Sequence, residues 1–248
     1  EMVQYGDIEM SMFGMTVLSF LDDRLAVVNM PFLINSTEEA DRYIYDENAE
    51  SRKALDDILA ENGMISVAFG EAGFRQITNS KREIRKPEDL KGLKIRVLGT
   101  CPMFFDLYGQ LGADPTAMNM SEVFSALQQG VVDGQENAVE AYRLSEVQKY
   151  ITCWNGVYDA VAFVASPVFW EKVGDDAAMI QECAVQAMAE QVASCRASEA
   201  SILEEFAQTM TVTHLTEEET CFVRSGFTSA ASVTYCAVTF ATYGITGV

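Results

Sequence analysis

One arginine stands out among the residues that could do chemistry. Arg96 lies near the end of the segment Leu93–Val97, where apolar and polar residues alternate as they do in a strand. It is the one charged residue in the region 86–137 whose surroundings predict burial. A guanidinium presents a planar fork that matches a carboxylate, and in a closed, dry cleft this charge-assisted pair is stronger than a neutral hydrogen bond. Arg96 is therefore a candidate carboxylate-binding residue, and an exposed strand arginine beside Lys94 is the alternative.

The patterns of common catalytic sites are absent from the sequence. The chain has a single histidine, His214, in a β-like stretch near its end, and no serine lies in a G-x-S-x-G motif. Neither G-x-G-x-x-G nor a P-loop occurs, and residues 70–73 hold only a glycine pair that predicts a turn. Asp133 and Glu136 could be paired carboxylates, but Asp133 followed by glycine first predicts the end of a strand. We therefore expect no enzyme.

The cysteines do not have the spacing of a metal site. None forms a C-x-x-C pair, so we expect neither a metal nor another cofactor. Cys183 and Cys195 fall on one predicted helix, where twelve residues separate them by ~18 Å, which is beyond the reach of a disulfide. Other pairings stay open among the six cysteines, which are Cys101, Cys153, Cys183, Cys195, Cys221 and Cys236.

Composition predicts a globular protein and limits its partners. The 248 residues are 49% hydrophobic, which suffices for a core, and no run of about 18 apolar residues could span a membrane. The first residues lack the features of a signal peptide, so we expect that any such peptide has been lost. A net charge of −20, with scattered basic residues, argues against nucleic acid as a partner. It also repels anions at long range, but screening over ~8 Å lets a local arginine prevail at contact.

Strands and helices alternate along the chain, as they do in α/β lobes. Two capping boxes predict helix starts, at Ser36 with Glu39 and at Asn119 with Glu122. Helical spacing then continues until a glycine ends each helix. The first helix ends at Asn62-Gly63 and is followed by a strand at Met64–Phe69. The second ends at Gly130 and is followed by a strand at Val131–Asp133.

A long helix is predicted in the last third of the chain. No proline or glycine intervenes between Asp175 and Met210, and apolar residues hold one face. Such a helix would be ~54 Å long, which is more than one small lobe needs. The alternative is two ordinary helices broken near Ala197–Ser198.

Several motifs, in order and at nearly a known spacing, resemble the solute-binding subunit of tripartite ATP-independent periplasmic (TRAP) transporters. They are PEDLKGLKIRV at 87–97, LGADP at 111–115, SEVFSALQQGVVDGQEN at 121–137 and SEVQKY at 145–150. Weaker similarity extends to Gly6–Glu9, Met30–Leu33 and the long helix. The chain departs from the family in lacking several dozen residues before Gly6, including a first strand. It also looks a few residues short between Asn137 and Glu146.

The resemblance implies an α/β, two-lobed periplasmic-binding-protein-like (type II) fold with a long helix bridging the lobes. One lobe would comprise residues 1–75 and 160–198, without the family's first strand, and the other 76–159 and 199–248. It further implies a monomeric periplasmic or extracytoplasmic receptor that captures a small organic acid and delivers it to TRAP membrane permease subunits. An ABC-type or sensor-associated binding protein and an α/β enzyme are the alternatives.

The resemblance also implies which residues contact the ligand. Arg96 occupies the position of the family's carboxylate-clamping arginine, and Asn137 that of an asparagine that donates to the same carboxylate. Arg75 matches a second arginine that many members direct into the cleft, with a solvated strand arginine as the alternative.

Further pocket positions follow from the same resemblance. Met120 and Phe74 would be wall residues, although both could equally be core residues. Asn155 lies on a strand that crosses between the lobes, where many relatives carry histidine just beyond it and this chain has Gly156. The first lobe would contribute Phe13 and Gly14.

Overall fold

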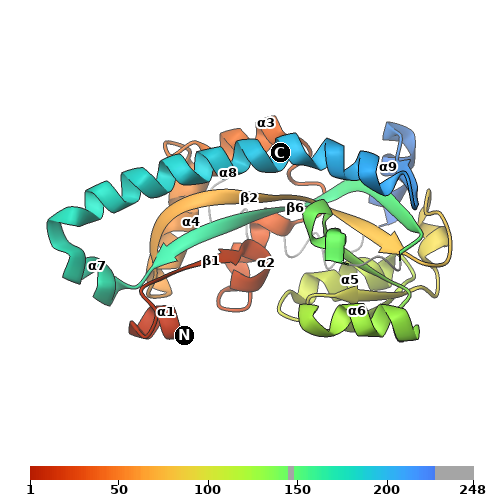
Figure 1. The fold of residues 1–248 in the computed structure, drawn as a ribbon, viewed down its shortest axis with the longest axis horizontal. Coiled ribbons are helices and arrows are strands. Elements are labelled where there is room, and N and C mark those ends of the chain that lie inside the picture. Colours follow the sequence, from red (N-terminus) through yellow and green to blue (C-terminus); the bar gives the residue numbers. More distant parts are fainter. Residues whose placement is uncertain (145–147, 227–248) are drawn as a thin grey trace.

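The computed structural model describes residues 1–144 and 148–226, and a single seven-stranded sheet runs through them (Figure 1). The strands are β1 (Met10–Gly14), β2 (Ile65–Asn79), β3 (Lys94–Val97), β4 (Asp114–Ala117), β5 (Gly134–Ala138), β6 (Tyr150–Ala165) and β7 (Thr211–His214). Their order is β1-β6-β2-β5-β3-β4, and β7 pairs with β6. The predicted α/β class is therefore confirmed.

Two long antiparallel strands connect the halves of the molecule (Figure 1). β2 has 15 residues and β6 has 16, and their register runs from Ile65 opposite Ala165 to Asn79 opposite Tyr150. Fifteen residues in a strand span ~50 Å, which exceeds an ordinary strand severalfold. The halves thus share a continuous sheet. The sequence predicted only Met64–Phe69 of β2, and its glycine pair at 70–73 lies inside the strand rather than in a turn.

The two long strands are irregular where they cross the middle of the molecule. Their register shifts between Glu71 and Gly73 and again between Arg75 and Ile77. Gly73 has a φ of 92°, which glycine adopts without strain. Opposite Gln76, residues 153–156 of β6 bulge out of the ladder.

Helices cover the sheet on both sides, with α1, α2 and α4 over one half and α5 and α6 over the other (Figure 1). Between residues 1 and 144 they are α1 (Met2–Tyr5), α2 (Met15–Leu18), η1 (Asp23–Asn29), α3 (Thr37–Ala40), η2 (Asp41–Tyr45), α4 (Glu50–Glu61), η3 (Pro87–Leu90), α5 (Pro102–Gln110), α6 (Met120–Gln129) and η4 (Val139–Leu144). Beyond residue 147 they are α7 (Pro167–Val173), η5 (Gly174–Asp176), α8 (Ala177–Phe206) and α9 (Glu217–Gly226).

Each half of the molecule has its own hydrophobic core. In one half, Leu59, Leu18 and Met15 pack with apolar residues of β6. In the other half, Phe104 and Leu107 of α5 pack against β3. Two cores joined by long strands allow the halves to move as units.

The long helix predicted from the sequence is one unbroken helix, so the two-helix alternative is wrong. α8 has 30 residues, or ~45 Å, and lies along both halves (Figure 1). The side-chain amide of Gln191 fixes it to β2 by accepting from the backbone N–H of Glu71 at 2.9 Å and donating to its carbonyl at 2.8 Å. A Cβ at Gly70 would lie 2.7 Å from Gln191 Oε1 and 2.8 Å from Met188 Sδ, so a side chain there would force Gln191 and Met188 to move.

The first predicted helix is interrupted. Ser36 caps it as expected, because its Oγ accepts from the Glu39 N–H at 3.2 Å. Helical spacing continues in the sequence, but residues 46–49 form a turn between η2 and α4 in which the Asp46 carboxylate accepts from the Asn48 N–H at 2.9 Å. This local hydrogen bond competes with the helix and favours the turn.

The second capping box is wrong in detail. α6 does begin after Asn119, but the Asn119 side chain makes no capping hydrogen bond. The helix ends as predicted at Gly130, which has a φ of 69°. The following strand starts at Gly134 rather than at Val131.

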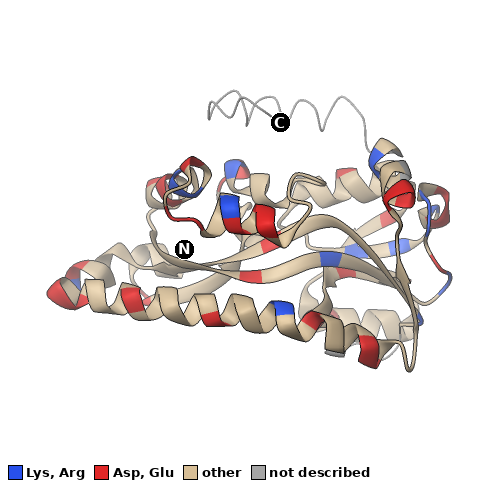
Figure 2. Ribbon diagram, turned by 90° about the horizontal axis from the view of Figure 1, so that it is seen from above, with Lys and Arg blue, Asp and Glu red and all other residues tan. Residues whose placement is uncertain are grey.

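Acidic residues recur along α8, whereas basic residues are few there (Figure 2). Within the described part of the chain, no helix combines the length and apolar character that crossing a membrane requires. Five cysteines of that part are free thiols, and Cys236 lies outside it.

Candidate ligand-binding site

Arg96 is almost completely buried on β3, with 1% of its surface exposed, so the alternative of an exposed strand arginine is wrong. Its Nε donates to the Met118 carbonyl at 2.9 Å. Its Nη2 is buried and has no hydrogen-bond partner among residues 1–144 and 148–226. Burial lowers the pKa of Arg96, with Glu136 opposing that shift, but an arginine side chain stays protonated in proteins. Arg96 therefore holds an unused cationic donor.

Strand register places Arg96 and Asn137 on the same face of the sheet. Arg96 pairs with Gln135 in the parallel ladder, and Asn137 follows Gln135 by two residues on β5. Residues two apart in a strand share a face. Asn137 also contacts the start of α6, because its Nδ2 lies 3.7 Å from Met120 Sδ. The fold thus brings together three of the predicted residues, Arg96, Asn137 and Met120.

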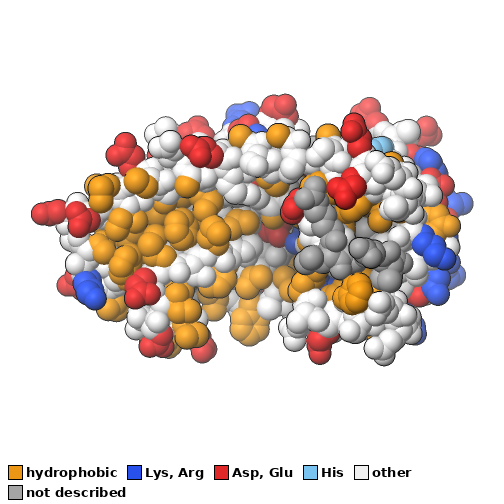
Figure 3. Space-filling view, viewed as in Figure 1, with side chains coloured by type: hydrophobic (Ala, Val, Ile, Leu, Met, Phe, Trp, Pro, Cys, Tyr) orange, Lys and Arg blue, Asp and Glu red, His pale blue; other side chains and the backbone are white. Residues whose placement is uncertain are grey.

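A cavity of about 670 Å³ lies beside this face, under α8, and Figure 3 shows a hollow near the middle of the molecule. Asn137 and Phe74 line it; Arg96 lies buried on the face of the sheet that also carries Asn137. The other lining residues are Glu71, Ala72, Val161 and Ala138–Ala141 from the strands and η4, and Gln191, Ser194, Cys195, Ser198, Glu199 and Ile202 from α8. The volume suits a small molecule.

The walls formed by β2 and α8 carry acidic groups. Glu71 is 2% exposed and forms an ion pair of 2.7 Å with Arg196. Burial and the nearby charge of Glu71 raise the pKa of Glu199, while a hydrogen bond with Gln76 opposes the shift. The Gln76 side chain also holds the bulge of β6, because its Oε1 accepts from the Trp154 N–H at 2.9 Å.

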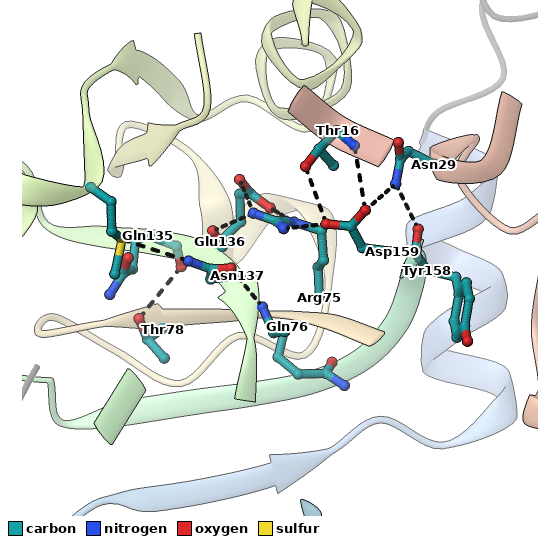
Figure 4. A network of polar contacts seen from close by, with 12 residues as sticks. Thr16, Asn29, Arg75, Gln76, Thr78, Gln135, Glu136, Asn137, Tyr158 and Asp159 are labelled. Carbon is teal, nitrogen blue, oxygen red and sulfur yellow. Dashed lines mark hydrogen bonds and ion pairs between the residues drawn. The ribbon is translucent and has the colours of Figure 1, made fainter. Parts of the chain in front are cut away.

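Arg75 lies on the opposite face of the sheet from Arg96. Arg75 pairs with Ala138, which follows Asn137 directly and therefore points to the other face of the sheet. The guanidinium of Arg75 lies over the ring of Phe104 on α5. Its guanidinium makes four hydrogen bonds to Glu136 and Asp159, including Nε to Glu136 Oε2 at 2.6 Å and Nη1 to Asp159 Oδ2 at 2.9 Å (Figure 4). Direct ligand binding by Arg75 stays a prediction, because intramolecular partners occupy most of its donors.

Neither carboxylate that holds Arg75 was predicted from the sequence as its partner. Glu136 is 0% exposed, so Arg96 is not the one buried charge between residues 86 and 137, as the sequence had indicated. Although burial acts to lower it, the pKa of Arg75 is raised by Glu136 and Asp159. Asp159 was detectable in principle as a lone charge within the apolar strand 157–165.

The network around Arg75 continues to the first helices of the chain (Figure 4). Asp159 Oδ2 accepts from Thr16 Oγ1 at 3.1 Å, and Asp159 Oδ1 accepts from Asn29 Nδ2 at 3.1 Å. Gly14 adjoins it, since a Cβ there would lie 3.4 Å from Asp159 Oδ2. Charged and polar groups thus connect β5, β2, β6 and α2.

The remaining predicted residues are divided between core and bulge. Phe74 lines the cavity and also packs edge-on against Tyr158, with ring centroids 5.2 Å apart. Phe13 is partly buried against the core of the first half. Asn155 is exposed in the bulge, with a φ of 48°, and its Oδ1 accepts from Gln76 Nε2 at 2.7 Å. Neither Phe13 nor Asn155 is among the residues that line the cavity.

The side chains considered for catalysis or metal binding have separate partners and do not form one site. Asp133 accepts from the Lys94 N–H at 3.0 Å, whereas Glu136 is bound to Arg75. His214 is exposed at the end of β7. In the described ranges, no three His, Cys, Asp or Glu residues are grouped so that they could hold a metal ion.

Residues 1–231 match the model of the bacterial extracellular solute-binding proteins, family 7. The chain belongs to this family. Among curated relatives, the 2,3-diketo-L-gulonate-binding periplasmic protein YiaO of Escherichia coli is 32% identical over 165 residues, which are 65% of this chain and 49% of that protein. The chain spans about half the length of the curated relatives it matches first.

Solved structures of TRAP periplasmic solute-binding proteins share the fold. The protein from Ralstonia eutropha, with bound (S)-2-acetolactate, has a TM-score of 0.87 and 31% identity, covering 98% of this chain and 78% of that one. The sugar acid binding protein of Advenella mimigardefordensis, with galactonate, has a TM-score of 0.87 and 28% identity, covering 97% and 77%. The family resemblance and the two-lobed fold predicted from the motifs are confirmed.

Proposed function

We propose that this chain captures a small organic acid in the cavity beneath α8 and presents it to the membrane permease subunits of a TRAP transporter. The observation that carries the proposal is the buried Nη2 of Arg96, a cationic donor without a partner among the described residues, on the sheet face of Asn137. Leaving such a donor unsatisfied is costly, so a carboxylate that reaches it gains a strong pair.

The relatives support the chemical class of the ligand. The Ralstonia protein holds a hydroxy-keto acid and the Advenella protein a sugar acid, and the Escherichia coli relative is named for a diketo sugar acid. All three ligands carry a carboxylate, which is the group that Arg96 and Asn137 can bind together.

The proposal extends to the arrangement of the protein in its transport system. We place the lobe boundaries at residues 75, 159 and 198, so that the cavity lies between the lobes. We also propose that the protein is a monomer in the extracytoplasmic space. It acts as a receptor and releases the acid unchanged. Product analysis after binding would separate this role from that of an enzyme.

The test is a calorimetric screen of small carboxylates, sugar acids and neutral sugars, followed by the same titration on Arg96→Lys. Lysine keeps the charge but loses the planar fork, so affinity for the acids should fall by at least about tenfold, or ~1.4 kcal/mol. Arg85→Lys is the matched control, because the Arg85 side chain is 50% exposed and pairs with Glu83 and Glu219 at the surface.

Two outcomes would contradict the proposal. One is a screen in which only neutral sugars bind. The other is wild-type affinity in a folded Arg96→Lys protein, which would remove Arg96 from the site.

A further inference from the structure

The cavity wall carries several acidic residues besides Asn137. Glu71 comes from β2, Glu140 from η4 and Glu199 from α8, and no lysine or arginine is among the described residues that line the cavity. The hydroxyl groups of Ser194 and Ser198 complete this wall. A carboxylate ligand therefore meets repulsion from these acidic side chains as well as attraction from Arg96 and Asn137.

Glu71 and Glu199 differ in how their charge is balanced. Arg196 donates to Glu71 at 2.7 Å and also pairs with Asp41. Glu199 forms no ion pair within the described residues, and its pKa is raised by burial and by the charge of Glu71. Glu199 is half-buried and its hydrogen-bond partner is the neutral side chain of Gln76, so a cationic group on a ligand would balance its charge.

We propose that the solute is a zwitterion, with its carboxylate on Arg96 and Asn137 and a protonated amine on Glu199. This inference rests on the proposed function and names the class of acid that the site prefers. An ammonium group offers three donors and a positive charge, so it balances Glu199 and offsets the repulsion from Glu71. An acid whose far end is neutral leaves that charge uncompensated.

The experiment compares acids that differ only by the amine. Straight-chain carboxylates of three to six carbons are titrated beside the ω-amino acids of the same length, together with a panel of α-amino and sugar acids. We expect at least one amino acid to bind at least about tenfold more tightly than its amine-free counterpart.

Glu199→Gln keeps the size of the side chain and removes the charge. It should abolish most of the preference for the amine while leaving the affinity for the amine-free acid equal or higher. Glu182→Gln is the matched control, because Glu182 is exposed on the same helix and lies outside the cavity lining. Circular dichroism checks that each variant is folded.

The outcomes separate this inference from the proposed function. If sugar acids or plain carboxylates bind through Arg96 and no amino acid binds more tightly, the zwitterion is overturned and the receptor function stands. An amine preference that survives Glu199→Gln also overturns it. If no carboxylate of any kind binds, both proposals fail.

Discussion

Arg75 and Arg96 have the same side chain and opposite environments. The guanidinium of Arg75 lies between two carboxylates, so its charge is balanced within the protein. Arg96 has a carbonyl as its hydrogen-bond partner and an Nη2 without one in the described part of the chain. The first arrangement stabilises a structure, and the second is suited to a charged ligand.

We predict that Arg75→Gln lowers the free energy of unfolding by about 3–5 kcal/mol, because it leaves Glu136 and Asp159 buried without their cation. Urea denaturation measures the loss. Arg85→Gln, which breaks exposed pairs, should cost far less than Arg75→Gln. If Arg75→Gln is too unstable to study, Arg75→Lys should show a smaller loss in the same direction. A stable Arg75→Gln protein that fails to bind acids would instead make Arg75 a ligand-binding residue.

The local pattern did not decide the burial of Arg96. Alternation in Leu93–Val97 puts Arg96 on the same side of the strand as Lys94, which is exposed, and the family motif was what favoured a buried arginine. The partners of Arg75 could not be predicted from the sequence either. Asp159 is 84 positions from Arg75 in the chain, so only the antiparallel pairing of β2 with β6 brings them together. The fold brings together three residues taken from the family motif, Arg96, Asn137 and Met120, and their contact with a ligand stays a prediction.

At the scale of elements, β5 approaches β2 so closely that one position admits no side chain. A Cβ on Gly134 would lie 1.9 Å from the Thr78 carbonyl oxygen, which is backbone and cannot turn aside. This contact sets the spacing of the strand that carries Glu136 and Asn137.

Gly134→Ala should therefore destabilise the protein by about 3 kcal/mol or more, since the strands must separate. Gly109→Ala is the matched control, because nothing lies within 4 Å of a Cβ built there, on α5. That change should be neutral or stabilise by up to about 1 kcal/mol. Denaturant unfolding midpoints of the two variants test this prediction. Equal midpoints would contradict the close contact between Gly134 and the Thr78 carbonyl.

Helices were easier to predict than the long strands. α8 has no glycine or proline and a sustained pattern, so its continuity follows from local preferences. β2 contains Gly70 and Gly73, which are ordinary turn signals, and it stays a strand because α8 packs closely on Gly70 and Gly73 sits in a bulge. Tertiary contacts therefore overrule the local signal.

At the scale of the molecule, the two halves touch across from the long strands. Thr100 Oγ1, in the segment before α5, donates to the Thr16 carbonyl at 3.2 Å, and Ser19 Oγ lies 3.5 Å from the Thr100 carbonyl. These few hydrogen bonds are weak beside the shared sheet, so they can open and close.

We predict that a saturating acid ligand compacts the protein without changing its helix content, because closure bends the long strands and leaves the two cores intact. Small-angle scattering gives the radius of gyration, and circular dichroism gives the helix content. Without ligand, the Thr100→Val protein should have a larger radius of gyration than the wild type, since it loses the hydrogen bond from Thr100 Oγ1 to the Thr16 carbonyl. Scattering curves that superimpose for the wild type with ligand, the wild type without ligand and Thr100→Val would count against closure.

α8 contacts β2 through Gln191, lines the cavity with Glu199 and packs in a separate hydrophobic cluster through Phe206. One added residue turns the remainder of a helix by roughly 100° and advances it by ~1.5 Å. An insertion after Gln191 would therefore rotate Glu199 out of the cavity and Phe206 out of its core, and no insertion length restores both angle and advance. Substitutions on the outward face of α8 leave these attachments intact, whereas a change in the number of residues between them breaks at least one.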